Sequence, residues 1–205
     1  MPTETFSKLK PDKKAKIIEA TLTEFSMHPY EHVNLANIIR DSGIARGSFY
    51  QYFVDKDDLY MFIIHHVSEM KGEVFKDIFD LSIEMTFLER FKKLYLRGFI
   101  FAQKYPKLVQ AGYYMTQSSL FRSSDLYKKS YEGGIQFFEM LIKKDQEKGI
   151  IKDSIDAKFL AESILSYMNT INLDYYMYSS EKMQTIEKNV DMIIDILQKG
   201  IENHV

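Results

Sequence analysis

Apolar residues recur every three to four positions along most of this chain, and this spacing predicts a protein built of α-helices. The clearest early example runs from Pro11 to Met27. Its apolar face consists of Ala15, Ile18, Leu22 and Phe25. Proline suits the first turn of a helix, and Pro29 lies just beyond the last turn. We therefore predict an amphipathic helix over residues 11–27.

Two short helices and a long one are predicted next. Asn34 is a good N-cap for a helix that ends at Gly43, where glycine can adopt a left-handed conformation. A second short helix covers about residues 45–52. Asp55 and Asp58 then form a sequence like a capping box, which starts a fourth helix that reaches about residue 80.

The rest of the chain predicts five longer helices, at residues 83–104, 106–117, 123–148, 157–178 and 181–203. The chain is therefore predicted to be all-α with about nine helices. Only 9 Gly and 4 Pro occur among 205 residues, which favours long helices. The pair Gly133–Gly134 interrupts the seventh helix, where it either kinks the helix or admits a close neighbour.

The composition is that of a globular protein, with 45% hydrophobic residues, 27% charged residues and a formal net charge of -2. The absence of Cys excludes disulfides, thiolate catalysis and thiolate metal sites, and agrees with a reducing compartment. The first 30 residues hold no apolar signal region, and no apolar run approaches the ~18 residues of a bilayer span. We expect a cytoplasmic protein without a membrane partner.

Two short helices joined at Gly43 and braced by the first helix predict a helix-turn-helix unit, whose second short helix can enter a major groove. The motif residues around this turn are Gly43, Ile44, Gly47, Tyr50, Tyr52, Phe53, Lys56 and Leu59. This arrangement resembles the signature of the TetR family of bacterial transcriptional regulators over about 50 residues. Two departures are Ser42, where the family usually has Ala, and Ala45, where it usually has Ser or Thr.

The resemblance implies two domains: a helix-turn-helix DNA-binding domain over residues 1–54, and an effector-binding and dimerisation domain over residues 55–205. It also implies a homodimer that binds a palindromic DNA operator, usually as a repressor, and that an effector releases. The aromatic residues and Met of the larger half favour a small lipophilic or aromatic effector. In this mechanism the ligand shifts the fourth helix and so changes the separation of two recognition helices, which must lie about 34–36 Å apart on DNA. No cofactor is implied.

The residues expected at the DNA are Asn34, Ala45, Arg46, Gly47, Ser48, Tyr50, Gln51, Tyr52 and Lys56. Arg46 can bind a guanine edge or a phosphate, and Gln51 can pair with an adenine edge. The hydroxyls and the lysine suit phosphates, while Phe49 and Phe53 are the better core candidates. Gly47 either lets the backbone approach DNA closely or relieves helix packing.

The charge of residues 1–60 qualifies this expectation, because eight Lys and Arg stand against nine Asp and Glu. Non-specific affinity for DNA should therefore be modest and strongly dependent on salt. The cations cluster in the amino-terminal arm and at the second short helix, about residues 45–52.

The last two helices are expected to form a four-helix dimer interface with their symmetry mates, as the resemblance implies. The residues expected there are Leu160, Ile164, Tyr167, Ile171, Tyr175, Val190, Ile193 and Leu197. The alternative is that both helices are internal to one protomer.

Aromatic residues and 11 Met in the larger half permit an adaptable apolar cavity for an effector. The residues proposed to line it are Tyr95, Phe99, Tyr113, Phe137, Met168 and Asn172. The alternative is that most of them are simple core residues.

Two other function classes are the alternatives to a DNA-binding regulator. An enzyme is disfavoured because the chain has no nucleophile elbow, Walker loop, dinucleotide fingerprint or pair of Glu-x-x-His motifs. His65, His66 and Glu69 nevertheless have the spacing of a metal-binding helix edge. A relative that acts through a protein partner without binding DNA is the second alternative, against which the intact Arg46, Tyr50, Tyr52 and Lys56 argue.

Overall fold

The computed structural model describes residues 2–178 and 183–201, and every regular element within these ranges is helical. Nine helices of seven or more residues correspond to the nine predicted ones, so the all-α class is confirmed. Two helices of four residues, α1 (Glu4–Ser7) and α8 (Ser119–Arg122), were not predicted. None of these helices combines the length and the apolarity needed to cross a membrane.

The chain forms two compact units. The first contains the residues up to Val74 together with Tyr105–Ser124, and the second contains Phe75–Lys104 and the residues from Asp125 onward. Helix α5 (Lys56–Phe79) contributes to both units. The expected division of roles at residues 54 and 55 remains a prediction.

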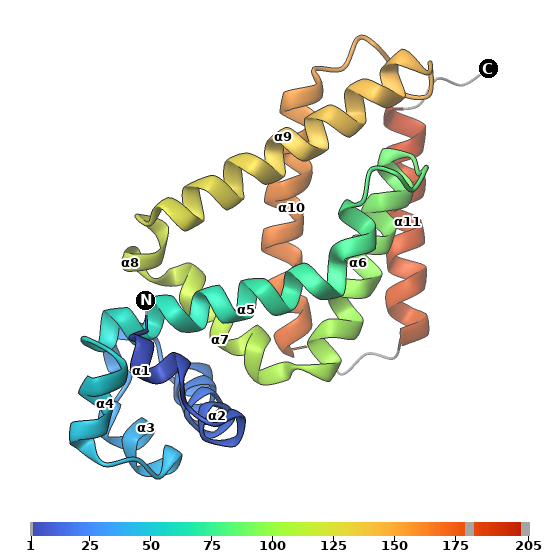
Figure 1. Ribbon diagram of the computed structural model, residues 1–205. Coiled ribbons are helices and arrows are strands. Elements are labelled where there is room, and N and C mark those ends of the chain that lie inside the picture. Colours follow the sequence, from blue (N-terminus) through green and yellow to red (C-terminus); the bar gives the residue numbers. More distant parts are fainter. Residues whose placement is uncertain (1, 179–182, 202–205) are drawn as a thin grey trace. The chain divides into compact units, whose positions relative to one another are not determined.

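The first unit is organised around α2 (Pro11–Met27), which packs against both α3 (Leu35–Ser42) and α7 (Pro106–Gln117). The 3-10 turn η1 (Tyr30–His32) joins α2 to α3, and α4 (Arg46–Tyr52) follows (Figure 1). The largest fully buried apolar side chains of this unit are Ile17, Phe25, Ile38, Phe49, Phe53, Leu59, Tyr60 and Ile63.

The start of α5 is fixed by two aspartates. Asp55 Oδ1 accepts a hydrogen bond from the backbone N–H of Asp58 at 2.8 Å, and Asp58 Oδ2 accepts one from Val54 N–H at 3.1 Å. The first bond confirms Asp55 as the predicted cap, while Asp58 reaches the N–H of Val54 rather than that of Asp55, and both carboxylates place negative charge at the positive end of the helix.

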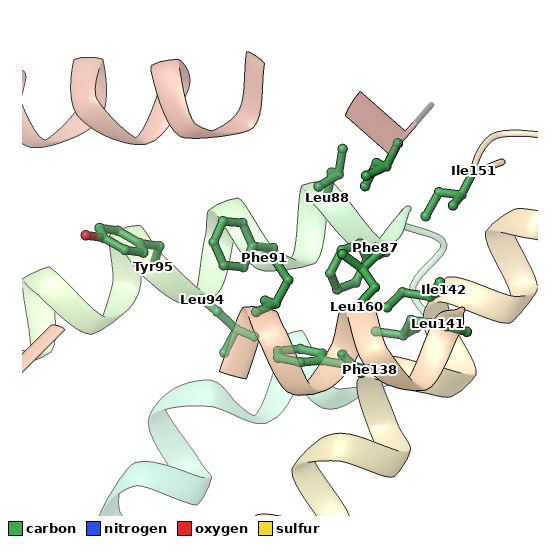
Figure 2. Packing of buried hydrophobic residues seen from close by; sticks show 14 of the residues in the cluster. Phe87, Leu88, Phe91, Leu94, Tyr95, Phe138, Leu141, Ile142, Ile151 and Leu160 are labelled. Atoms are coloured by element: carbon green, nitrogen blue, oxygen red, sulfur yellow. The ribbon is translucent and has the colours of Figure 1, made fainter. Parts of the chain in front are cut away.

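The second unit contains α6 (Phe87–Lys104), α9 (Asp125–Glu147), α10 (Ala157–Tyr178) and α11 (Met183–Ile201). Helix α6 packs against α9, α10 and α11, and α9 also packs against α10. Their shared core is rich in aromatic and aliphatic side chains (Figure 2). It includes Phe87, Leu88, Phe91, Leu94, Phe138, Leu141, Ile142, Ile151 and Leu160.

Helix α9 runs without a break through Gly133–Gly134. A Cβ built on Gly134 would lie 3.6 Å from Leu165 Cδ1 of α10, which is ordinary van der Waals contact. A Cβ would therefore fit at Gly134, and a Cβ at Gly133 would meet no atom within 4 Å, so the packing requires glycine at neither position.

The prediction that the fifth helix begins at residue 83 is wrong by four residues. Thr86 N–H donates to Glu89 Oε2 at 2.8 Å and Glu89 N–H donates to Thr86 Oγ1 at 3.3 Å, a reciprocal cap that starts α6 at Phe87. The carbonyl of Ile83 accepts instead from the buried guanidinium of Arg90, which also donates to the carbonyl of Ile78.

Candidate nucleic-acid interface

The turn between α3 and α4 has the geometry that glycine allows. Gly43 has φ +67°, in the left-handed region. Its N–H donates to Arg40 O at 3.1 Å, and Ile44 N–H donates to Ile39 O at 3.3 Å. These two bonds form a Schellman motif, which satisfies the last carbonyls of α3 and sets the direction in which the chain enters α4.

The start of α3 is held from α2. Asn34 Oδ1 accepts from Ala36 N–H at 2.9 Å, which confirms Asn34 as the N-cap. Glu24 of α2 is only 3% exposed, and its carboxylate accepts from Asn34 N–H at 2.9 Å and from Asn37 Nδ2 at 3.2 Å. Sequence reasoning did not single out Glu24, because a glutamate on a helix is ordinarily a solvated residue.

Helix α4 is anchored by one aromatic face. Phe49 and Phe53 are 1% and 0% exposed, and the ring of Phe53 lies 5.5 Å from that of Phe62 in α5. Because this face is buried, the opposite face is turned to solvent. The exposed positions are Ala45, Arg46, Gly47, Tyr50 and Gln51, with Ser48 half-buried.

Gly47 faces open space. No protein atom lies within 4 Å of a Cβ built on this residue, so the glycine does not relieve helix packing. Its backbone is bare on the outward side of α4, which suits a close approach of DNA.

Tyr52, which was also expected at the DNA, is buried, unlike the exposed residues of α4. Its side chain is 4% exposed, and its hydroxyl accepts a hydrogen bond from Lys13 Nζ at 3.0 Å. Lys13 is an exposed residue of α2, so the pair brings a cation to the carboxyl end of α4. Lys13 was predicted only as one of the arm's lysines, and its pairing with Tyr52 depends on the fold.

Lys56 is also engaged within the first unit. Its Nζ donates to the carbonyl of Tyr30 at 3.0 Å and lies 4.3 Å from the centre of the Tyr30 ring. The hydroxyl of Tyr30 donates in turn to Asp57 Oδ1. A phosphate at Lys56 would have to compete with these contacts.

The proposed effector residues fall into three groups. Tyr95 is buried in the core of the second unit (Figure 2). Phe99 is buried in the same core, and Phe137 and Met168 are partly buried against it. Tyr113 belongs to the first unit. Asn172 lies outside the residues whose side chains the structure describes.

The proposed dimer face needs a correction. Leu160, Ile164 and Val190 are 8%, 4% and 0% exposed and belong to the core of the protomer itself, because α6 and α9 cover them. Ile193 and Leu197 are partly buried against that core. Tyr167 is exposed, and Ile171 and Tyr175 lie outside the described side chains. Among the described side chains of α10 and α11, the large apolar ones exposed to solvent are Phe159, Tyr167, Met192 and Ile196.

The metal alternative is not supported. His65, His66 and Glu69 all lie in the described part of the chain, and no group of three His, Cys, Asp or Glu able to hold a metal is formed there. The ring of His66 stacks on Phe62 at 6.3 Å between centroids.

The left-handed turn at Gly43 and the exposed strip on α4 have the geometry of a helix-turn-helix unit. Residues 17–61 match the family described as bacterial regulatory proteins, tetR family. The chain is 22% identical to an HTH-type transcriptional regulator, YvdT, of Bacillus subtilis, over 98% of each chain. Over residues 17–61 the chain thus matches the tetR family, and along its whole length it is similar to an HTH-type transcriptional regulator.

Solved structures share the fold. A TetR family transcriptional regulator from Chloroflexus aurantiacus aligns over 100% of both chains with a TM-score of 0.83 at 24% identity. The regulator FadR from Bacillus subtilis, whose structure holds stearoyl-CoA, aligns over 92% of this chain and 99% of its own with a TM-score of 0.69 at 17% identity.

Proposed function

We propose that this chain is a homodimeric, ligand-responsive repressor that acts in the cytoplasm by binding a palindromic DNA operator. The observation that carries the proposal is the outward strip of α4, in which Arg46, Gly47, Tyr50 and Gln51 are exposed while Phe49 and Phe53 anchor the same helix in the core. A short helix anchored on one face and polar on the other is the element that reads a major groove.

The strip divides into two kinds of contact. Arg46 and Gln51 carry side chains that can form paired hydrogen bonds with base edges, so we assign sequence preference to them. Ser48, Tyr50, Asn34 and the Lys13–Tyr52 pair are assigned to phosphates, which set the register of the helix on the duplex. Lys56 is the weakest of these assignments, because Tyr30 already holds its ammonium group.

A palindromic operator requires two recognition helices, one from each protomer, and exposed apolar residues on α10 and α11 support a dimer. Phe159 is 68% exposed and Ile196 is 70% exposed. Large apolar side chains that stand in solvent in one protomer are candidates for burial against a second. We therefore move the proposed dimer face to Phe159, Tyr167, Met192 and Ile196, and keep Ile171, Tyr175, Ile193 and Leu197 as proposed neighbours.

The effector is proposed to be lipophilic and to enter among the aromatic side chains of the second unit. Tyr95, Phe99, Phe137 and Met168 meet in one core, and the similar regulator FadR was solved with stearoyl-CoA. Asn172 stays a proposed member of this site, whereas Tyr113 belongs to the first unit. An effector acts only if it prefers one arrangement of the protein, and α5, which contributes to both units, is the element proposed to carry the change to α4.

Selection of bound duplexes from a random pool tests the operator. We expect a palindromic consensus with half-sites one helical turn apart. Arg46→Ala and Tyr50→Phe should each weaken binding to that consensus while sedimentation and helicity stay unchanged. Arg122→Ala, an exposed arginine outside the helix-turn-helix, is the control and should bind as the wild type does. Recovery of no preferred duplex would contradict the proposal and favour action through a protein partner.

A ligand screen tests the effector. Fatty acids and their acyl-CoA esters are added to the protein bound to its selected duplex. We expect a compound that raises the melting temperature of the free protein also to release the duplex, since a ligand stabilises the state it prefers. A compound that stabilises the protein without any change in DNA affinity would contradict the proposed switch.

A further inference from the structure

The carboxyl end of α4 is held by the segment that precedes α2. The backbone N–H of Thr3 donates to Tyr52 O at 3.0 Å, and Thr3 Oγ1 donates to Gln51 O at 2.6 Å. The last carbonyl groups of a helix have no N–H donor within the helix itself. Thr3 therefore satisfies two of these groups on α4, and helix α1 lies beside α4 as a result (Figure 1).

Phe6 fixes this segment in place. Its side chain is 4% exposed, and its ring lies 5.0 Å from Phe53, 5.0 Å from Phe62 and 6.1 Å from Tyr52. The hydroxyl of Thr3 also accepts from Phe6 N–H at 3.4 Å and so caps α1. The position of Thr3 is thus set by buried aromatic packing rather than by an exposed contact alone.

Helix α4 needs support from outside because it is short and lacks a cap of its own. It has seven residues, and its N-cap is Ala45, which makes no side-chain hydrogen bond to the first turn. Isolated helices of this length are not stable in water. The carboxyl-terminal bonds from Thr3 therefore have a larger share in holding α4 than they would in a long helix with a Ser or Thr cap.

We propose that Thr3 is a positioning residue for DNA recognition, which holds the carboxyl-terminal turn of α4 and so aims Tyr50 and Gln51 at the operator. Thr3 is uncharged and its hydroxyl is already bonded to Gln51 O, so it adds no phosphate contact of its own. This inference rests on the proposed function, since it assigns the geometry of the same DNA-reading helix to a residue outside the helix-turn-helix.

The experiment compares Thr3→Val, Thr3→Ser and Ser7→Ala in the full chain. Valine keeps the shape and the backbone N–H of Thr3 but removes the hydroxyl, whereas serine retains the hydroxyl. Ser7 is an exposed residue of α1 whose hydroxyl donates to Thr3 O. We expect Thr3→Val to lower affinity for the selected operator about fivefold, the equivalent of one hydrogen bond. Affinity for random duplex and the salt dependence should stay the same, and the other two variants should bind as the wild type does.

Amide hydrogen exchange in the free protein supplies a second readout. The amides of residues 49–53 should exchange faster in Thr3→Val and at the wild-type rate in Thr3→Ser. Unchanged operator affinity in Thr3→Val would overturn the proposal, and so would an equal loss of affinity for operator and random duplex. If the wild type selects no operator, the proposed function fails. If the amides of residues 49–53 exchange in Thr3→Val at the rate of the wild type, the proposal that Thr3 stabilises α4 is overturned.

Discussion

Oδ2 of Asp145 in α9 accepts a hydrogen bond from the backbone N–H of Phe87 at 2.7 Å. Phe87 is the first residue of α6, where backbone N–H groups have no partner within the helix. Asp145 is 3% exposed, so the second unit holds a carboxylate in its core in order to cap a neighbouring helix. Burial raises the pKa of Asp145 above 3.8, and the Phe87 N–H opposes this shift.

This pKa predicts how the stability of the second unit depends on pH. Because the folded state holds the proton more tightly than the unfolded state, the contribution of Asp145 to stability is fully present below pH 3.8 and is lost as the pH rises through the folded-state pKa. Asp145→Asn keeps an oxygen for Phe87 N–H and carries no charge. We expect the free energy of unfolding of this variant to rise relative to the wild type across that pH window and to level off above it, as measured by urea denaturation.

In Asp77→Asn, the free energy of unfolding relative to the wild type should change with pH in the opposite direction. A hydrogen bond from Arg97 holds the pKa of Asp77 below 3.8, so its contribution to stability is present above that value and is lost as the pH falls through the folded-state pKa. The variant should lose stability relative to the wild type as the pH rises. If the relative stability of both variants changed with pH in the same direction, the raised pKa of Asp145 would be contradicted.

Glu24 is predicted to be essential for the stability of the first unit. Glu24→Ala leaves the N–H of Asn34 and the amide of Asn37 without their buried acceptor, which should lower the free energy of unfolding by about 1–3 kcal/mol. Glu19→Ala is the matched control on the same helix, since Glu19 is exposed and pairs with Lys107. That change should cost about 1 kcal/mol or less. If chemical denaturation showed that both variants lose the same free energy of unfolding, the buried hydrogen bonds of Glu24 would not contribute more to stability than an exposed ion pair.

Gly47→Ala is predicted to move stability and DNA binding in opposite directions. Alanine favours helix over glycine by up to about 1 kcal/mol, and the added methyl meets no protein atom within 4 Å. The melting temperature should therefore stay the same or rise. Operator affinity should fall, because the methyl occupies the space between the backbone of α4 and the DNA.

The contrasting variant is Gly43→Ala, which forces a non-glycine residue into the left-handed region at φ +67°. We expect it to lower stability by about 1 kcal/mol or more. Operator affinity of Gly47→Ala equal to that of the wild type would remove Gly47 from the DNA interface.

Lys13 is predicted to contribute one phosphate contact. Lys13→Ala should reduce the slope of log K against log salt by about 0.9, the value for one phosphate neutralised on duplex DNA. Lys143→Ala removes an exposed lysine that pairs with Glu139 in the second unit, and it should leave the slope unchanged. A slope identical to that of the wild type in Lys13→Ala would place Lys13 away from the DNA backbone.

Most of the helices could be predicted because their signals are local. The helix over residues 106–117 has proline in its first turn, and residues 11–27 have both proline and a regular apolar face, so the predicted bounds of these two helices match the structure. The late start of α6 also had a local signal that the prediction overlooked, since Thr86 and Glu89 have the spacing of a capping box.

The features that sequence reasoning missed depend on contacts distant in the chain. Helix α1 is four residues long, which is too short for any periodicity, and it forms because Phe6 packs on Phe53 and Phe62. Likewise the apolar face with Leu160 and Ile164 is visible in the sequence of α10. Periodicity does not show whether α6 and α9 of the same protomer or a second protomer covers that face.

The division of α4 into an anchoring face and an outward face has a consequence for how this regulator can diversify. Phe49 and Phe53 hold the helix, whereas Arg46 and Gln51 are exposed on the other side of it. Under the proposed function, exchanges at positions 46 and 51 therefore change the preferred DNA sequence at little cost to folding. New binding sites can arise on this scaffold through one or two codon changes, and libraries randomised at these positions should yield mostly folded regulators.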